Sequence, residues 1–461
     1  MVSLEDTRTR GESISISGND TAEAAPATLR RTLTYRDLLA YGLAYVSPFA
    51  PLSTIGYVWR ASDGLIVLAY VLGAACMYFT ARSYATMSEV LPNAGSVYGF
   101  ARQALGPLPG FLAGWMILLD YLLIPAYIYV VIAVAMGTLV PQLDRGLWIV
   151  LLAIATLGIN WFGIAVTSRV NLLSVTVQIG FVLLLLACSV VALYSGRGNG
   201  ALTLRPLFSP GVFHLHDIFT ATSICVMSFL GFDAISTLAE EVKDGNTRLV
   251  GRAIVSVLIL SGVLFALVAW VLGNLLAGFK IHDLAAASYE LAAWSVGAWA
   301  SITLAWLSAA LVGFTNALPM QAGVARVLYA MGRDLQLPRV FARVHARYGT
   351  PYVGMIVSTA LSLAVALEMR FRMGELVSMV NFGALSGFLL LHVSVLRLFW
   401  FKGRSRRWFV HLLVPLVGII VVVAVLSGLS SLAMSLGVGW LAAGLLYGIA
   451  LRRANRDRLA I

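Results

Sequence analysis

The chain has 461 residues, of which 60% are hydrophobic and only 11% are charged, against roughly 25% charged in an ordinary soluble domain. A soluble fold cannot bury that much apolar surface, because a single hydrophobic core stops growing at roughly 250–300 residues. The composition therefore excludes a soluble protein and predicts an all-α integral membrane protein. The formal net charge of +11 would also suit a nucleic-acid-binding protein, but the placement of the basic residues, described below, argues against that class.

The N-terminal segment, residues 1–33, is rich in Ser, Thr, Ala and charged residues and has no hydrophobic periodicity. This composition is typical of disorder, and we expect a disordered cytoplasmic tail. The polar, acidic start of the chain predicts no cleavable signal peptide. Three cysteines, Cys76, Cys188 and Cys225, lie in apolar segments without metal-type spacing, so we expect packing residues, with neither a disulfide nor a zinc site.

Twelve apolar stretches follow the tail, each long enough to cross ~30 Å of hydrocarbon, which takes roughly 20 helical residues. The third and the eighth exceed this length, and we expect them to tilt or to extend past the membrane. The predicted spans are 38–59, 64–87, 110–140, 146–165, 170–194, 216–240, 252–277, 292–330, 352–369, 374–399, 409–428 and 431–450.

The basic residues predict the orientation of these spans, because cytoplasmic segments carry an excess of Lys and Arg. With the N-terminus inside, 25 of the 32 basic residues fall on the cytoplasmic side, four of them in a C-terminal tail at 451–461. The seven outside are Arg60, Arg145, Arg197, Arg205, Lys280, Arg370 and Arg372. We therefore expect a multi-pass protein of the cell inner membrane with both termini in the cytoplasm. The same bias explains the net charge without nucleic acid as a partner.

Two spans have centres that a regular helix would not tolerate. The first contains Ser47-Pro48-Phe49-Ala50-Pro51, and the sixth contains Gly231 followed by Asp233. Proline inside a helix removes a hydrogen bond, and broken helices persist in membranes where the freed backbone lines a cavity. The sixth span comes five spans after the first, an odd number, so the two helices enter from opposite sides. This is expected for an inverted repeat with a substrate site at the breaks. The alternative is a pair of ordinary kinks.

Several motifs resemble one family. Ser228-Phe-Leu-Gly-Phe-Asp-Ala-Ile-Ser-Thr-Leu-Ala-Glu-Glu241 is similar to the sixth-helix signature of the amino acid–polyamine–organocation (APC) superfamily. Arg326-Val-Leu-Tyr-Ala-Met-Gly-Arg-Asp334 resembles its loop after the eighth helix. Gly42-Leu-Ala-Tyr-Val-Ser-Pro48, Leu118-Leu-Asp-Tyr-Leu-Leu-Ile-Pro125, Val380-Asn-Phe-Gly-Ala384 and Pro415-Leu-Val-Gly418 are similar to bacterial putrescine importers.

The resemblance covers roughly residues 30–450 and implies a transporter that works by alternating access. It implies a 34–450 transporter domain built from twelve helices. Ten of them would form two inverted five-helix repeats, about 34–195 and 212–400. Two extra helices would follow at about 409–450.

Carboxylates inside the membrane are costly and require a reason. Asp120, beside Tyr121 in the third span, is either an anion for a substrate ammonium or a structural hydrogen-bonding group. Asp233 either caps the second half of the sixth helix or serves substrate and protons. If that half is α-helical, Asp233, Ser236, Thr237 and Glu240 lie on one face, a polar stripe suited to proton coupling or gating. Glu241, next to it, either joins this function or is simply solvated.

The first break predicts the charge of the substrate. Amino acid carriers of the superfamily have a glycine-rich break there, whose N–H groups bind the substrate carboxylate. Here Pro48 and Pro51 remove two donors, and an anion-binding nest is harder to build. Aromatic groups stand nearby, which favours a cation through charge and cation–π contacts. The candidate substrate-binding residues are Tyr45, Ser47, Pro48, Phe49, Asp120, Tyr121, Gly231, Phe232, Asp233 and Asn316.

The function predicted from these residues is secondary active import of a small organic amine, a putrescine-like polyamine, by proton symport. For the substrate, the alternative is a neutral or cationic amino acid. For the driving force, the alternatives to proton symport are sodium symport, uniport driven by the membrane potential, and exchange of amines or amino acids. We expect no enzyme, because no catalytic motif or histidine cluster is present, and no phosphate-binding loop points to ATP hydrolysis. We also expect no cofactor and no metal.

Overall fold

The computed structural model describes residues 33–91, 96–162, 168–209, 214–333 and 335–459, so the predicted tail lies outside the described residues except for Leu33. Within these ranges the chain is mostly helical. The α-helices are α1 (Tyr35–Val46), α2 (Ala50–Ala61), α3 (Ile66–Val90), α4 (Ser96–Leu105), α5 (Pro107–Leu139), α6 (Arg145–Trp161), α7 (Ser168–Tyr194), α8 (Leu215–Phe229), α9 (Arg248–Leu276), α10 (Ala287–Ser295), α11 (Ala298–Leu307), α12 (Leu318–Arg333), α13 (Tyr352–Glu368), α14 (Met373–Val395), α15 (Val414–Leu426) and α16 (Ser431–Leu459). The tighter or wider helices are η1 (Phe232–Glu241), η2 (Lys243–Gly245), η3 (Ser308–Ala317), η4 (Arg339–Ala342), η5 (Leu396–Lys402) and η6 (Phe409–Leu413).

The membrane spans agree with the apolar pattern of the sequence. Eight helical stretches are long and apolar enough to cross a bilayer, and two bent pairs, α1 with α2 and α8 with η1, raise the number to ten. Two shorter apolar helices, α6 and α13, have 17 residues each and occupy the fourth and ninth predicted spans. The chain is therefore an all-α, multi-span membrane protein. That all twelve stretches cross the membrane stays a prediction.

Two regions differ from the predicted spans. The short helices α4 and α10 lie outside the core of any predicted span, since runs of nine or ten residues give no membrane-length signal. Gly297, with φ of 129°, separates α10 from α11, so the eighth span runs from Ala298 to Arg333 and not over 292–330. At the C-terminus, α16 continues to Leu459 and includes most of residues 451–461, whose place as a cytoplasmic tail stays a prediction.

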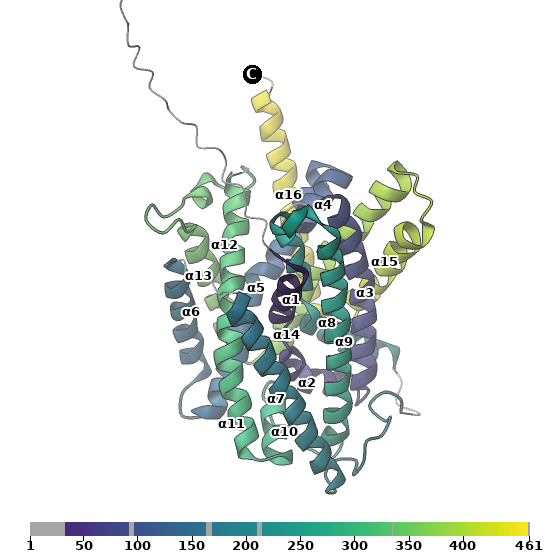
Figure 1. The fold of residues 1–461 in the computed structure, drawn as a ribbon. Helices are drawn as coiled ribbons and strands as arrows, with labels where there is room; N and C mark the ends of the chain where they lie inside the picture. The colour runs from purple at the N-terminus through teal and green to yellow at the C-terminus, as the bar shows by residue number, and fades with distance from the viewer. Residues whose placement is uncertain (1–32, 92–95, 163–167, 210–213, 334, 460–461) are drawn as a thin grey trace, which may run out of the picture. The chain divides into compact units, whose positions relative to one another are not determined.

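The interior of the bundle is built around α5, the most deeply buried of the long spans. It packs along α14, and both lie in the middle of the helices in Figure 1. Gly383 on α14 makes this approach possible, because a Cβ there would lie 2.7 Å from the backbone nitrogen of Asp120. The close contact fixes the depth and the direction of the α5 segment that carries Asp120.

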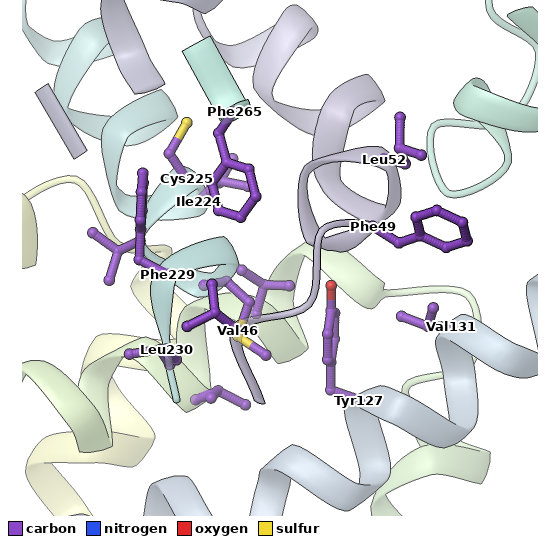
Figure 2. Packing of buried hydrophobic residues seen from close by; sticks show 14 of the residues in the cluster. Val46, Phe49, Leu52, Tyr127, Val131, Ile224, Cys225, Phe229, Leu230 and Phe265 are labelled. Carbon is purple, nitrogen blue, oxygen red and sulfur yellow. The ribbon is translucent and has the colours of Figure 1, made fainter. Parts of the chain in front are cut away.

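Both predicted breaks are present and they touch each other. The helix axis bends by 43° between α1 and α2 and by 41° between α8 and η1. Ser47 at the first break has φ of 59°, and Gly231 at the second has φ of 112°. A Cβ at Gly231 would lie 3.1 Å from the carbonyl carbon and oxygen of Tyr45. The side chains of Val46, Phe49 and Leu230 in Figure 2 come from these two breaks. Whether the halves of the chain are related by inversion stays a prediction.

A third irregularity lies in the eighth span, where η3 is a π-helix between α11 and α12. Pro319, just inside α12, cannot donate a backbone hydrogen bond, and π-helical turns commonly mark functional sites. Asn316 in η3 donates from Nδ2 to the carbonyl oxygen of Tyr45 at 3.2 Å. Its own Oδ1 accepts a hydrogen bond from the Thr315 hydroxyl at 3.0 Å. The irregular turn is thereby tied to the first break.

Candidate functional site

A cavity of about 70 Å³ lies where the two breaks, α5, α10 and the eighth span meet. A water needs about 10–15 Å³ by this measure, so the cavity has room for several waters or part of a small ligand. No charged group is among the described side chains that line it. The lining residues are Tyr45, Val46, Ser47, Phe49, Ala50, Leu52, Ser53, Ile124, Tyr127, Ile128, Val131, Met227, Leu230, Tyr289, Ser308, Val312, Asn316 and Met320.

Four of the predicted substrate residues, Tyr45, Ser47, Phe49 and Asn316, line this cavity, whereas Pro48 does not. Phe49 is buried and its ring packs edge-on against Phe181 of α7, with centroids 6.0 Å apart. The hydroxyl of Ser53 lies 2.7 Å from that of Tyr127, whose ring stands beside the break in Figure 2. Sequence reasoning missed Ser53, Tyr127 and Tyr289. The four-residue spacing of Ser308, Val312 and Asn316 is the pattern that points to a shared face.

The first break is held to the fifth span by a buried amide that the sequence did not single out. The Ser47 hydroxyl donates to Oε1 of Gln178 at 2.7 Å, and Nε2 of Gln178 donates to the Ser174 hydroxyl at 3.0 Å. Gln178 has 0% of its surface exposed. Ser47 needs such a partner, because a positive φ is an unfavourable conformation for a residue with a Cβ.

We expect Gln178→Leu to lower the free energy of unfolding by about 1–3 kcal/mol, because the Ser47 hydroxyl is left buried without an acceptor. The maximal rate of transport should fall with it. The matched variant Ser174→Ala removes only the second partner of Gln178 and should have the smaller effect on both. Thermal unfolding of the purified protein and initial uptake rates measure the difference, and equal behaviour of the two variants would contradict the role of Gln178.

The backbone donors of the first break are already engaged. The N–H of Ser47 donates to the carbonyl of Leu43 at 3.0 Å, and that of Ala50 donates to the carbonyl of Ser47 at 3.0 Å. The N–H of Phe49 donates to the hydroxyl of Ser47 at 3.3 Å. Pro48 and Pro51 have no N–H to offer. Residues 47–51 thus hold no free backbone donor for a carboxylate.

The two predicted carboxylates, Asp120 and Asp233, are buried, and neither is among the residues that line the cavity. The two carboxylates lie near each other. Asp233 is also near the backbone N–H groups of Gly231 and Ala234 at the start of η1. Oδ1 of Asp120 has no hydrogen-bond partner. In the described residues, no Lys, Arg or His lies within 4.0 Å of either carboxylate to form an ion pair.

Helical periodicity connects Asp120 to the cavity. The lining residues of α5, which are Ile124, Tyr127, Ile128 and Val131, recur at i, i+3, i+4 and i+7 and so share one face. Asp120 is the next position on that face, about 6 Å along the axis toward the start of α5. On α1, Tyr41 precedes the lining residue Tyr45 by one turn, and their rings are 4.6 Å apart. Asp120 and Tyr41 therefore lie one helical turn beyond the lining residues of α5 and α1.

The three other predicted substrate residues, Phe232, Tyr121 and Gly231, also lie outside the lining of the cavity. Phe232 is fully buried, and its ring meets those of Tyr84 and Phe388 at centroid distances of 5.9 and 6.0 Å. Tyr121 is near both Asp120 and Asp233 but does not line the cavity. Gly231 has no side chain, and this allows the carbonyl group of Tyr45 to approach its backbone closely.

The polar stripe predicted for the sixth span is not a single face. η1 is a 3-10 helix, which has three residues per turn, so positions i and i+3 eclipse each other. Asp233 and Ser236 therefore share one face, and Thr237 and Glu240 share the next. Ser236 donates to the hydroxyl of Ser96 at 3.0 Å, and Thr237 donates to the carbonyl of Ala234 at 2.7 Å. The side chain of Glu240 lies outside the described part of the chain.

Glu241 is half-buried at the end of η1. Its carbonyl accepts a hydrogen bond from the N–H of Leu33 at 3.0 Å, and Lys243 donates back to the carbonyl of Leu33 at 3.0 Å. The segment before α1 is thus paired with the end of the sixth span. This contact gives the backbone of Glu241 a structural part, separate from any role of its carboxylate.

Comparison with known proteins identifies the family to which this chain belongs. The family model described as amino acid permease matches residues 38–447. The chain is 30% identical over 454 residues to the low-affinity putrescine importer PlaP of Escherichia coli, covering 96% of this chain and 98% of the relative. It is 29% identical to the branched-chain amino acid permease BcaP of Bacillus subtilis over 411 residues, with 81% and 82% covered. Cationic amino acid transporter 7 of Arabidopsis thaliana is 26% identical, with 82% and 68% covered. The chain therefore belongs to the amino acid permease family of the APC superfamily.

Proposed function

We propose that this protein imports a small organic amine, a putrescine-like polyamine, across the inner membrane by alternating access. The observation that carries the proposal is the position of Asp120. It is a buried carboxylate with an unpartnered oxygen, one helical turn beyond a cavity without charged lining. A buried anion needs a cationic partner, and the described protein residues supply none. The ammonium group of a substrate is the partner that fits.

A linear diamine, with a cation at each end, suits a site that extends from the cavity toward Asp120 and Asp233. One ammonium would lie against the hydroxyl and ring of Tyr45 and Tyr127 in the cavity, where cation–π attraction is available. The second would reach toward Asp120 and Asp233, one turn farther along α5. The similarity to a low-affinity putrescine importer supports the same substrate class.

An amino acid would need a receptor for its carboxylate. In carriers with broken helices the positive ends of half-helices commonly supply it. Here the donors of residues 47–51 are used or missing, and Asp233 lies over those at the start of η1. The similarity to BcaP and to cationic amino acid transporter 7 keeps an amino acid permease, or an exchanger, as the second candidate.

Uptake of radiolabelled compounds into proteoliposomes separates the two candidates. We expect putrescine to accumulate and to be displaced by other diamines, but not by leucine or glutamate. Arginine is the informative intermediate, because it carries both a second cation and a carboxylate. The amine proposal fails if leucine or arginine enters while putrescine neither enters nor competes.

We further propose that protons drive the uptake and that Asp120 and Asp233 exchange them. Acidic residues inside the membrane commonly serve as proton relays. Glu240 and Glu241 would then lie at the cytoplasmic end of the path, with both chain termini in the cytoplasm. Collapse of the pH gradient at fixed membrane potential should reduce accumulation of putrescine, and replacement of sodium by potassium should not. The reverse pattern would establish sodium coupling.

A further inference from the structure

A basic turn, residues 397–409, joins the tenth and eleventh spans, and none of its residues is among those that line the cavity. It contains Arg397, Lys402, Arg404, Arg406 and Arg407, and no acidic residue occurs between Glu375 and Asp457. One apolar span ends at Lys402 and the next begins at Phe409. With only six residues between them, the turn must lie at the surface of the bilayer.

The basic side chains of this turn are available for a partner. All five are exposed, and none of them forms an ion pair within the described part of the chain. Glu89, at the end of α3, is an acidic group near the turn, since it acts electrostatically on His411. The turn itself carries five basic residues and no acidic one.

The backbone of the turn is held in place. Gly403 and Ser405 donate to the carbonyls of Leu398 and Phe399, each at 3.0 Å. The Ser405 hydroxyl lies 2.7 Å from Nδ1 of His411, and the His411 ring stacks on Phe399 with centroids 4.5 Å apart. Arg404, at φ of 43°, stands at the apex of this closed hairpin. The charges are therefore presented from a fixed support, which lowers the ordering cost of binding.

Aromatic side chains border the charges. Phe401, Trp408 and Phe409 are 63%, 58% and 57% exposed. Tryptophan is enriched where headgroups meet acyl chains, and its neighbours at that level are Lys and Arg side chains. The combination of exposed rings and unpaired guanidinium groups fits a partner that is apolar on one side and anionic on the other.

We propose that the basic turn is a binding site for anionic phospholipid. The phosphate of the headgroup would be held by Arg404, Arg406 and Arg407, which bind phosphate through paired N–H donors. The acyl chains would lie along the exposed rings of Phe401 and Trp408. Clusters of four to eight basic residues beside a span are a known pattern for such lipids.

The chain offers a matched control on the same predicted side of the membrane. Arg339, Arg343 and Arg347 are also exposed, in the loop after the eighth span. They are spread over nine residues, whereas Arg404, Arg406 and Arg407 lie within four. The triple variants R404Q/R406Q/R407Q and R339Q/R343Q/R347Q therefore remove equal charge from two basic segments.

Native mass spectrometry of the full-length protein in detergent, titrated with dioleoyl phosphatidylglycerol or phosphatidylcholine, measures the binding. We expect the wild type to bind phosphatidylglycerol at least tenfold more tightly. R404Q/R406Q/R407Q should lose that preference, and R339Q/R343Q/R347Q should keep it within twofold. Inorganic phosphate at the same concentration should not displace the lipid.

Three results would overturn the proposal. One is a wild type that does not distinguish the two lipids, and another is an equal loss in both triple variants, which would mean a general effect of charge. The third is displacement by inorganic phosphate alone, which would make the turn a site for free phosphate. Thermal unfolding of each variant shows that the compared proteins are folded, and uptake of putrescine is not needed for any of these outcomes.

Discussion

Asp120→Asn is expected to lower the initial rate of amine uptake roughly 30-fold or more, without lowering the thermal stability of the protein. The first part follows from the loss of a buried charge partner, which commonly costs about 2–5 kcal/mol of binding free energy. The second follows because the wild-type carboxylate has an oxygen without a partner, and a buried unpaired charge is a cost to folding. An asparagine carries no charge to bury. Uptake in proteoliposomes and thermal unfolding in detergent measure the two parts.

Reduced uptake together with unchanged thermal stability would distinguish substrate recognition by Asp120 from a structural role. A carboxylate that only tied α5 to a neighbouring helix would lose stability and activity together on replacement. The control is Asp63→Asn, at an exposed turn between α2 and α3 where φ of 47° is readily adopted by asparagine. That variant should keep wild-type uptake. Full uptake by Asp120→Asn would contradict the proposed role of this residue.

The spans and breaks could be predicted because each has a local cause. Apolar runs of membrane length fix the spans wherever no short helix intervenes. The 292–330 stretch failed at its start because Gly297 separates α10 from α11 within a run of mostly apolar residues. Ser47, Pro48 and Gly231 mark the breaks directly, since proline and glycine act on the backbone of their own residue. The resemblance to the APC superfamily, stated from motifs, is confirmed by the family match.

The lining of the cavity could not be predicted because it depends on which helix faces meet. Tyr127 and Tyr289 come from segments far apart in the chain, and they line one cavity only after the helices have packed. The buried link between Gln178 and Ser47 has the same origin. The prediction for η1 failed for another reason. A 3.6-residue period was assumed where the segment after Gly231 is wound more tightly.

The second large effect is expected at the point where the breaks meet. Gly231→Ala should reduce uptake by at least tenfold and lower the free energy of unfolding by about 1–3 kcal/mol, the usual cost of a strained backbone position. Gly231 has φ of 112°, a conformation that disfavours any residue with a Cβ. The added methyl would also lie 3.1 Å from the carbonyl of Tyr45, which is backbone and cannot rotate away.

The Tyr45 carbonyl transmits the displacement, because it accepts the hydrogen bond from Asn316 of the π-helix. A shift of this carbonyl moves the cavity wall on both the first and the eighth span. The uptake rate should therefore fall even in the fraction of the variant protein that remains folded. Gly180→Ala is the matched control, since nothing lies within 4 Å of that position on α7 and its φ is not positive. Alanine in a helix interior should leave uptake unchanged and raise stability slightly. Wild-type uptake by Gly231→Ala would show that the contact between the breaks is not required, and the transport path would then have to lie elsewhere in the bundle.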